Sequence, residues 1–249
     1  MLEGVKKPRI AAAAAELSVP IDEEWKLYYW SGNFKGRGEY IRLMFEAAEV
    51  PYEEVGDAEH ILKLMDRNGR GEAPFPAFAP PMISGPGGVF LSQTPVCMAR
   101  LGKAFGLYPQ NEEDEFKALQ IVLSVADYHG EGRSSFHPVD NTASYLTQVE
   151  EAKITTAKFA EGRMKTWLHH FEHLLSVSKS SYFVGSSMTY VDIAVFYALW
   201  ATETQFPIEW GALDIPSLKA FKQRIASYRP IAAYLKSGRG RPFSGDSML

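Results

Sequence analysis

Cysteine is nearly absent from this sequence, since Cys97 is the only one in 249 residues. One cysteine excludes an internal disulfide framework and a thiolate metal cluster, and a reducing compartment is the simpler setting. No apolar run reaches about 18 residues, the length that would indicate a membrane span. Long basic blocks are also missing, and 26 basic against 30 acidic residues give a formal charge of −4. We therefore expect a cytoplasmic protein with neither a membrane nor a nucleic acid as its partner.

The two ends of the sequence lack the patterns of packed structure. The beginning, MLEGVKKPRIAAAAAELSV, has no strongly apolar core of the kind that a secretory signal needs, and Glu16 argues against a transit peptide. The end, GRGRPFSGDSML, is polar and rich in glycine. We predict flexible segments at 1–23 and 237–249.

The sequence after the first end mixes strand and helix patterns. Short runs rich in β-formers alternate with amphipathic helical patterns, and prolines and glycines separate them. The predicted order is a strand in KLYYW (26–30), a helix from Glu39, a strand in YEEV (52–55), a helix in AEHILKLMDRNG (58–69) closed by Gly69, a hairpin of PMIS and VFLS joined by GPGG, and a helix from Pro95.

The remainder of the sequence, from about Glu113 to Tyr234, is almost entirely helical. Apolar residues recur there at i, i+3, i+4 and i+7 spacing, as at Met164, Leu168 and Phe171. The predicted fold class is a mixed α/β domain followed by an all-α domain. The predicted boundaries are 24–103 for the first domain, 104–112 for a linker and 113–236 for the helical domain.

Two segments of the first domain carry motifs with chemical content. KLYYWSGNFKGRGEYIR places a tyrosine-aromatic pair, Tyr29-Trp30, before a Gly-Arg-Gly-Glu helix start. PPMISGPGGVFLSQTPVCMARLG places Pro81 before a strand, and the pair Gln93-Thr94 before a helix.

A third motif lies in the second domain, in YFVGSSMTYVDIAVFYALW. Thr189 followed by Asp192 predicts a capping box at a helix start, with Met188 packing on Ile193. Phe183 and Gly185 complete the pattern Phe-x-Gly-x-x-x-Thr-x-x-Asp. With these three motifs in this order, the sequence resembles the glutathione transferases, and Tyr29-Trp30 resembles the pair of the tyrosine-type classes (alpha, mu, pi and sigma). The loop after this pair is about two residues longer than the family pattern.

The resemblance implies a thioredoxin-like first domain, a homodimer and glutathione as co-substrate. The thiol of glutathione resembles that of cysteine, whose pKa is about 8.5, and only its thiolate is a good nucleophile. A phenol O–H held against the sulfur lowers this pKa. Because neighbours on a strand point to opposite faces, Tyr28 and Tyr29 cannot both face the cleft. Register with the family selects Tyr29 as the catalytic donor and leaves Tyr28 packed against a helix layer. Ser31 is the alternative donor.

The resemblance also implies residues that bind glutathione. Pro81 falls on the family's cis-proline, and Gln93-Thr94 falls on the pair that holds the γ-glutamyl end. Asp127 matches an acidic residue that reaches glutathione bound to the partner subunit. Arg37 could instead form an ion pair at the domain interface, and Lys63 could instead be a solvated helix lysine. The implied glutathione-binding set is Tyr29, Arg37, Lys63, Pro80, Pro81, Gln93, Thr94 and Asp127.

The electrophile is expected between the domains, and its site is the least constrained part of the prediction. Gly130, Gly132 and Pro138 are expected to interrupt a long helix there. The candidate residues are Trp30, Phe34, Tyr128, Arg133 and His137. His169 and His173 have the spacing of metal ligands, but without a third ligand we expect a solvated face and no metal.

Two functions are compatible with these residues. The first is conjugation of the glutathione thiolate to small hydrophobic electrophiles, a detoxification activity, or an isomerase or peroxidase reaction at the same site. The second is a binding or structural role on the same scaffold without catalysis, because a fold does not fix a function.

Overall fold

The computed structural model describes residues 24–66 and 68–243. The predicted N-terminal extension at 1–23 and the last six residues, 244–249, lie outside the described residues. Within the described part, no helix is both long and apolar enough to cross a membrane.

A four-stranded sheet forms the centre of the first domain, with the order β2-β1-β3-β4. Strand β1 (Lys26–Tyr28) pairs in parallel with β2 (Glu53–Val55) and antiparallel with β3 (Met82–Gly85), which forms the predicted hairpin with β4 (Val89–Ser92). The alternation of side chains along β1 sends Tyr28 to one face and Leu27 to the other.

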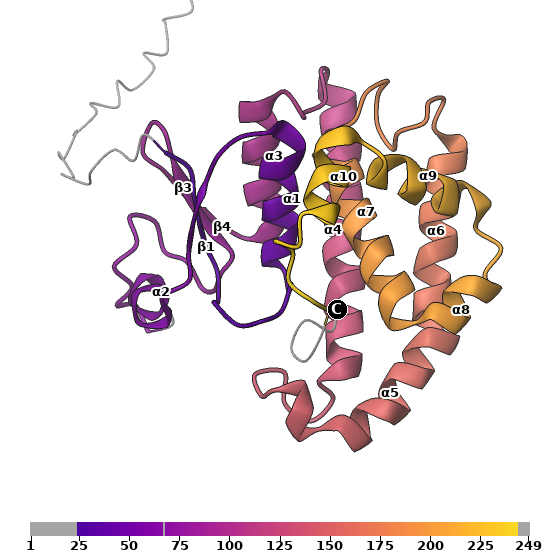
Figure 1. The fold of residues 1–249 in the computed structure, drawn as a ribbon, viewed down its shortest axis with the longest axis horizontal. Coiled ribbons are helices and arrows are strands. Elements are labelled where there is room, and N and C mark those ends of the chain that lie inside the picture. Colours follow the sequence, from indigo (N-terminus) through magenta and orange to yellow (C-terminus); the bar gives the residue numbers. More distant parts are fainter. Residues whose placement is uncertain (1–23, 67, 244–249) are drawn as a thin grey trace, which may run out of the picture.

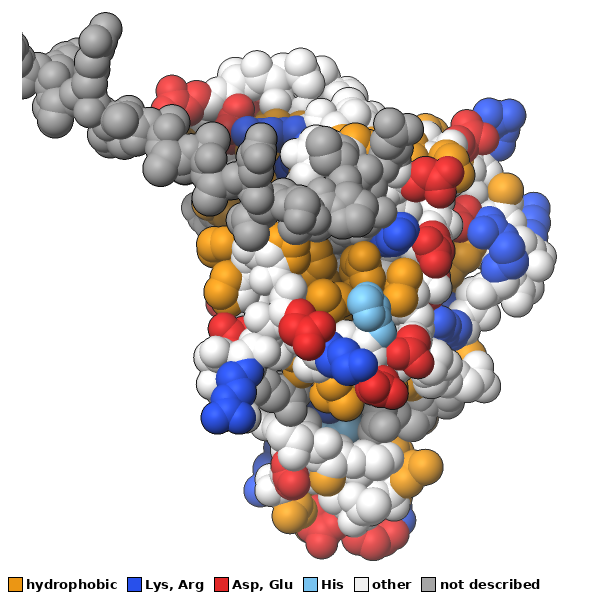
Figure 2. All heavy atoms as spheres, turned by 90° about the vertical axis from the view of Figure 1, so that its left-hand side faces the viewer, with side chains coloured by type: hydrophobic (Ala, Val, Ile, Leu, Met, Phe, Trp, Pro, Cys, Tyr) orange, Lys and Arg blue, Asp and Glu red, His pale blue; other side chains and the backbone are white. Residues whose placement is uncertain are grey.

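Helices cover both faces of this sheet (Figure 1). Helices α1 (Gly38–Ala48) and α3 (Thr94–Phe105) lie on the face that turns toward the second domain, and α2 (Ala58–Leu64) lies on the other. Helix α2 ends at Leu64, before the predicted stop at Gly69, because Met65 is already extended and pairs with Ala77. On the described part of the α2 side, charged side chains of both signs lie among apolar ones (Figure 2).

The second domain is helical, as predicted. Its long first helix runs through Gly130 and Gly132 without a break, which corrects the expected interruption. A glycine costs only about 1 kcal/mol inside a helix, and Pro138 follows the helix end. The elements are α4 (Glu112–Phe136), η1 (Tyr145–Thr147), α5 (Val149–Glu161), α6 (Arg163–Val177), α7 (Tyr190–Gln205), α8 (Pro207–Ala212), α9 (Pro216–Ala226) and α10 (Arg229–Lys236).

The predicted capping box forms at the start of α7. The carboxylate of Asp192 is fully buried and accepts from the backbone N–H groups of Thr189 at 2.7 Å and Phe183 at 3.0 Å, and from the Thr189 hydroxyl at 3.1 Å. These bonds satisfy donors at the helix start and fix the chain that leads into it. Helix α7 is thereby held as the buried centre of its domain.

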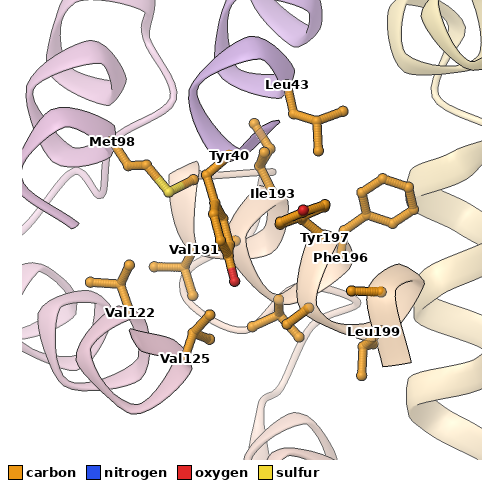
Figure 3. Close-up of a cluster of buried hydrophobic side chains, with 14 of the residues drawn as sticks. Tyr40, Leu43, Met98, Val122, Val125, Val191, Ile193, Phe196, Tyr197 and Leu199 are labelled. Atoms are coloured by element: carbon orange, nitrogen blue, oxygen red, sulfur yellow. The ribbon is translucent and has the colours of Figure 1, made fainter. Parts of the chain in front are cut away.

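The two domains share an apolar core at the junction of α1, α3, α4 and α7 (Figure 3). Tyr40 from α1 points between Met98, Val125 and Val191, and its ring meets that of Tyr197 edge-on at a centroid distance of 4.4 Å. The N-terminal end of α1 is therefore packed directly against the second domain.

Residues 237–243, predicted as part of a flexible tail, instead pack back onto both domains. Arg239 forms two hydrogen bonds with the Glu46 carboxylate, at 2.7 and 2.8 Å. Phe243 stacks on Tyr197 at a centroid distance of 5.9 Å. The chain after α10 thus returns to the region where β1 ends and α1 begins.

Candidate active site

Tyr29 lies directly after β1, on the side of the sheet that faces the second domain. Its backbone N–H donates to the carbonyl oxygen of Val55 at 3.2 Å, which fixes the main chain. The ring packs edge-on against Phe34 at 6.1 Å, with the Arg42 guanidinium 5.6 Å from its centre. The phenol oxygen accepts from the backbone N–H of Arg37 at 2.9 Å. The ring is thus held on several sides, and its hydroxyl lies at the start of α1.

The close approach of the main chain to this hydroxyl requires glycine at position 36. A Cβ atom there would lie 2.2 Å from the phenol oxygen, and the residue has a positive φ of 53°. Both features favour glycine. The carbonyl oxygen of Gly36 accepts from the Tyr197 hydroxyl of α7 at 2.9 Å, so the second domain also fixes this position.

The Tyr29 hydroxyl remains protonated at neutral pH. Burial raises its pKa above that of an ordinary phenol, and the backbone N–H groups of Arg37 and Gly38 and the Arg42 guanidinium only partly oppose this shift. Since the oxygen already accepts from Arg37, its proton remains to be donated, and no acceptor for it is found among residues 24–66 and 68–243. The group is chemically a hydrogen-bond donor.

A cavity of about 710 Å³ opens beside Tyr29, between the two domains. The predicted residues Trp30, Phe34, Arg37, Pro80 and Arg133 all line it. The remaining lining residues are Gly36, Phe78, Ala79, His129, Gly130, Ser134, Asn141, Thr142 and Ala143. The Arg133 guanidinium donates to the carbonyl oxygen of Asn141 at 3.0 Å and so ties α4 to the segment that follows it.

A smaller cavity of about 140 Å³ adjoins the first and shares Arg37 and His129 with it. Gln93 and Thr94 line this second cavity. Gln93 has a positive φ of 71°, and Thr94 is the first residue of α3. The Pro80-Pro81 peptide bond is cis, and Met82 opens β3 directly after it.

Three residues of the predicted glutathione set and its alternatives lie apart from these cavities. Lys63 is exposed on α2 and pairs with Glu59 at 2.8 Å. Asp127 is exposed on α4 and lines neither cavity. Ser31, the alternative donor, is exposed, lines neither cavity and precedes the first residue of α1 by seven positions. No ion pair of Arg37 is found among residues 24–66 and 68–243, whereas Arg42 forms ion pairs with Glu39 and Glu54 within the first domain.

Two residues of the predicted electrophile site are structural instead. Tyr128 is fully buried, and its hydroxyl lies 2.6 Å from that of Thr202 on α7. His137 is also buried, and its Nδ1 donates to the carbonyl oxygen of Ala143 at 3.0 Å. The expected break at the glycines does not occur, because α4 continues to Phe136 and turns Tyr128 into the core, while His137 follows the last residue of the helix.

The two histidines with metal-ligand spacing, His169 and His173, are both exposed on α6. Nδ1 of His169 donates to the carbonyl oxygen of Lys165 at 2.8 Å, one turn earlier on α6. No group of three histidine, cysteine or acidic side chains that could hold a metal ion is found within residues 24–66 and 68–243.

His129 is the site residue that the sequence analysis missed. It lies one helical turn before Arg133 on α4, a spacing that places both on one side of the helix and could have indicated it. The ring is buried, and Nδ1 lies 3.4 Å from the Tyr40 hydroxyl. Burial lowers its pKa well below the usual range, and the charges of Arg37 and Arg133 add to this shift. His129 is therefore a neutral group in the wall between the two cavities.

Comparisons with known proteins agree with this arrangement. The family model for the glutathione S-transferase C-terminal domain matches residues 135–238. A glutathione S-transferase of Plasmodium yoelii yoelii is 28% identical over 207 residues, which cover 81% of this chain and 88% of the relative. One of Plasmodium falciparum (isolate 3D7) is 27% identical over 84% of this chain and 93% of the relative. S-crystallin SL11 of Nototodarus sloanii is 23% identical over 88% of this chain and 98% of the relative.

Solved structures show the same fold. The Pi-class glutathione S-transferase of Onchocerca volvulus superposes with a TM-score of 0.70 at 18% identity, covering 91% of this chain and 100% of the other. The enzyme of Ascaris lumbricoides gives a TM-score of 0.65 at 21% identity, over 89% and 98%. Fold and site together define a two-domain protein, thioredoxin-like and then helical, with a phenol at the seam of the domains. Together, these comparisons support a glutathione transferase family for this chain.

Proposed function

We propose that this protein is a glutathione transferase in which the Tyr29 hydroxyl stabilises the thiolate of glutathione. The observation that carries the proposal is the geometry of this hydroxyl. Its oxygen is fixed by the Arg37 N–H at 2.9 Å, its proton has no acceptor among the described residues, and it borders a cavity of about 710 Å³. A protonated phenol in this setting can donate to a sulfur anion and stabilises it relative to the thiol.

The expected gain follows from the thiol equilibrium. A thiol of pKa about 8.5 is only about 3% thiolate at pH 7. If the phenol lowers this pKa to about 6.5, roughly three quarters of the bound glutathione is thiolate, a gain of about 25-fold in nucleophile. Holding the electrophile in the same cavity adds the effect of proximity. No metal is needed for either contribution.

Glutathione would lie along the edge of the first domain. Pro80, which borders the large cavity, supports contact with its cysteinyl part, and Gln93 and Thr94 at the start of α3 support contact with its γ-glutamyl carboxylate. Asp127 is exposed and so is accessible to glutathione held by a second copy in a homodimer. Lys63 can swing from Glu59 to the glycyl carboxylate, since this exposed pair is weak.

The electrophile would occupy the part of the cavity beyond Tyr29. Trp30, Phe34 and Phe78 give this wall its apolar area, which favours small hydrophobic molecules. Arg133 and Asn141 on the opposite side can orient a polar group that such a molecule carries. The same site can also serve a glutathione-dependent isomerase or peroxidase reaction, and substrate screening separates these reactions.

The proposal is tested by a thiolate absorbance titration of bound glutathione in the wild type and in Tyr29→Phe. We expect the variant to return the thiol pKa to about 8.5 and to lower kcat/KM at pH 7 roughly 10- to 100-fold. This loss should shrink above pH 9, where the free thiol ionises without help. Tyr28→Phe is the matched control, because the Tyr28 hydroxyl pairs with Ser84 on the other face of the sheet. Unchanged thiol acidity in Tyr29→Phe would contradict the role of Tyr29, and Ser31→Ala tests the alternative donor.

A binding or structural role is the second candidate, and the similarity to S-crystallin SL11 is the observation that favours it. Retention on glutathione-agarose combined with an aryl-halide conjugation assay distinguishes the two. Retention with turnover supports the transferase, and retention without turnover supports a binding protein. The absence of both retention and turnover supports a structural role.

A further inference from the structure

The segment that follows α10 lies against the loop that follows Tyr29. We call residues 30–36 the site loop and residues 238–243 the C-terminal strap. In the sequence they are more than 200 positions apart, yet the strap returns from α10 to the end of β1 (Figure 1). The site loop contains Gly32 and Gly36 and is followed by Arg37, whose N–H donates to the Tyr29 hydroxyl.

Arg241 is the main contact between the strap and the site loop. One nitrogen of its guanidinium donates to the carbonyl oxygens of Trp30 at 2.7 Å and Gly32 at 3.2 Å. The other nitrogen donates to the Glu54 carboxylate on β2 at 2.6 Å. A planar guanidinium with several donors in a fixed geometry suits this bridging role, which a lysine could fill only in part.

Glu54 also binds Arg42, which contacts both the Tyr29 ring and the end of the site loop. Arg42 binds both oxygens of Glu54, at 2.6 and 3.0 Å, and donates to the carbonyl oxygen of Lys35 at 3.1 Å. The same guanidinium lies over the Tyr29 ring. In addition, the N–H of Lys35 donates to the carbonyl oxygen of Pro242 at 3.2 Å, so the strap contacts both ends of the loop.

Phe243 completes the strap on the side of the second domain. It lies between Tyr197 and Trp200, and the buried Lys35 ammonium is 5.2 Å from its ring centre. Tyr197 in turn donates to the carbonyl oxygen of Gly36, next to the Tyr29 hydroxyl.

We propose that Arg241 is a positioning residue for the Tyr29 phenol, acting through the site loop. A loop with two glycines loses much conformational entropy when it is held in one shape, and the strap contributes contacts that offset this loss. Without them the Arg37 N–H and the phenol oxygen would drift apart, and the hydroxyl would no longer be aimed at one point in the cavity. The inference rests on the proposed function of Tyr29.

The test compares Arg241→Gln with Arg239→Gln in the full chain. Arg239 is a matched control, because it lies in the same strap and binds Glu46 with two hydrogen bonds but does not contact the site loop. For Arg241→Gln we expect amide hydrogen exchange of residues 31–37 to accelerate about tenfold in the ligand-free protein. The pKa of bound glutathione should rise by about 0.5 to 1 unit, with kcat/KM at pH 7 falling about three- to tenfold. Arg239→Gln should match the wild type in all three.

A further readout separates this inference from the proposed function. In protein labelled with ring-¹³C tyrosine, the Tyr29 signal is the one missing from Tyr29→Phe, and it should shift or broaden in ligand-free Arg241→Gln. If the wild type neither binds nor conjugates glutathione while this signal responds, the proposed function fails and the positioning role stands. If neither the signal nor the loop exchange responds, the positioning role is overturned whatever the activity.

Arg241→Lys guards against a variant that merely loses stability. Lysine retains the charge beside Glu54, so its thermal midpoint should be close to that of the wild type. It cannot hold Glu54 and both carbonyl oxygens at once, so the thiol pKa should remain raised by more than half of the Arg241→Gln shift. Thiol acidity that follows the thermal midpoint across the three variants would show that Arg241 contributes stability alone.

Discussion

Two segments of this protein lead into buried helices, and they are built in opposite ways. The segment before α7 is fixed locally, since the Asp192 carboxylate accepts from the N–H and hydroxyl of Thr189 and from the nearby Phe183 N–H. The segment before α1 has Arg37 at its N-cap and no side-chain cap from its own sequence. Instead, the N–H of Arg37 binds the Tyr29 hydroxyl. A helix start that lacks its own cap leaves donors for a functional group.

The difference shows why the candidate active site depends on contacts from residues distant in the sequence. The positive end of α1 and its N–H groups face the phenol, which favours negative charge nearby. The absence of a side-chain cap at the start of α1 also removes a local hydrogen bond that would hold the site loop. Its contacts come from Tyr197 on α7 and from Arg241 in the strap, both remote in sequence, and Glu54 on β2 holds Arg241 in turn.

The largest expected effect comes from removing the centre of this remote network with Arg42→Met. Arg42 is 3% exposed and binds Glu39, Glu54 and the Lys35 carbonyl oxygen. Its loss leaves the fully buried Glu39 carboxylate with fewer partners, so we expect about 4 kcal/mol lower free energy of unfolding. Urea denaturation measures this. Catalysis should fall as well, because the site loop is released. A loss below about 1 kcal/mol would show that local contacts suffice.

A smaller effect is expected at the other junction, with Asp192→Ala. The variant loses three accepted hydrogen bonds and leaves buried N–H groups unpaired, which should cost about 3 kcal/mol in urea denaturation. The thiol pKa of bound glutathione should be unchanged where the variant is folded, since α7 keeps its packing. If thiol acidity changes as much as in Tyr29→Phe, the two junctions are not separate devices.

The contrast also explains which features of the fold, and which directions of side chains, could be predicted from the sequence. The strands, the hairpin and the capping box depend on residues close in sequence, and patterns of period 2 and 3.6 or a Thr-x-x-Asp spacing indicate them directly. The strand alternation together with the family resemblance also predicted that Tyr29 faces the second domain and that Tyr28 faces the other side, while the catalytic role of Tyr29 stays a prediction. The packed strap could not, because GRGRPF has the composition of a flexible end and its partners lie in other elements.

The electrophile wall shows the same limit for side-chain direction. Tyr128, His129 and Arg133 lie within six positions of α4, and a shift of one residue turns a side chain by about 100° around a helix. With a break expected at the glycines, Tyr128 was predicted to line the cavity and His129 was not. The continuous helix reverses that choice, since Tyr128 faces the core and His129 faces the seam.

The smallest expected effect is on the pH dependence of the free energy of unfolding, and it is measured with His129→Asn. Because burial keeps the pKa of His129 well below 6.5, the unfolded chain takes up a proton below pH 6.5 that the folded protein refuses. The wild type should therefore lose up to about 1.4 kcal/mol per pH unit as the pH falls, and the variant should lack this term. Burial raises the pKa of Asp192 to about 6, so this group makes the free energy of unfolding rise as the pH falls, which is the opposite slope. Asp192 is present in both the wild type and His129→Asn. The difference between their urea-denaturation series at pH 7 and 5.5 therefore isolates the contribution of His129. Parallel curves for wild type and His129→Asn would mean that the histidine is already solvated and that acid leaves the α1 junction intact.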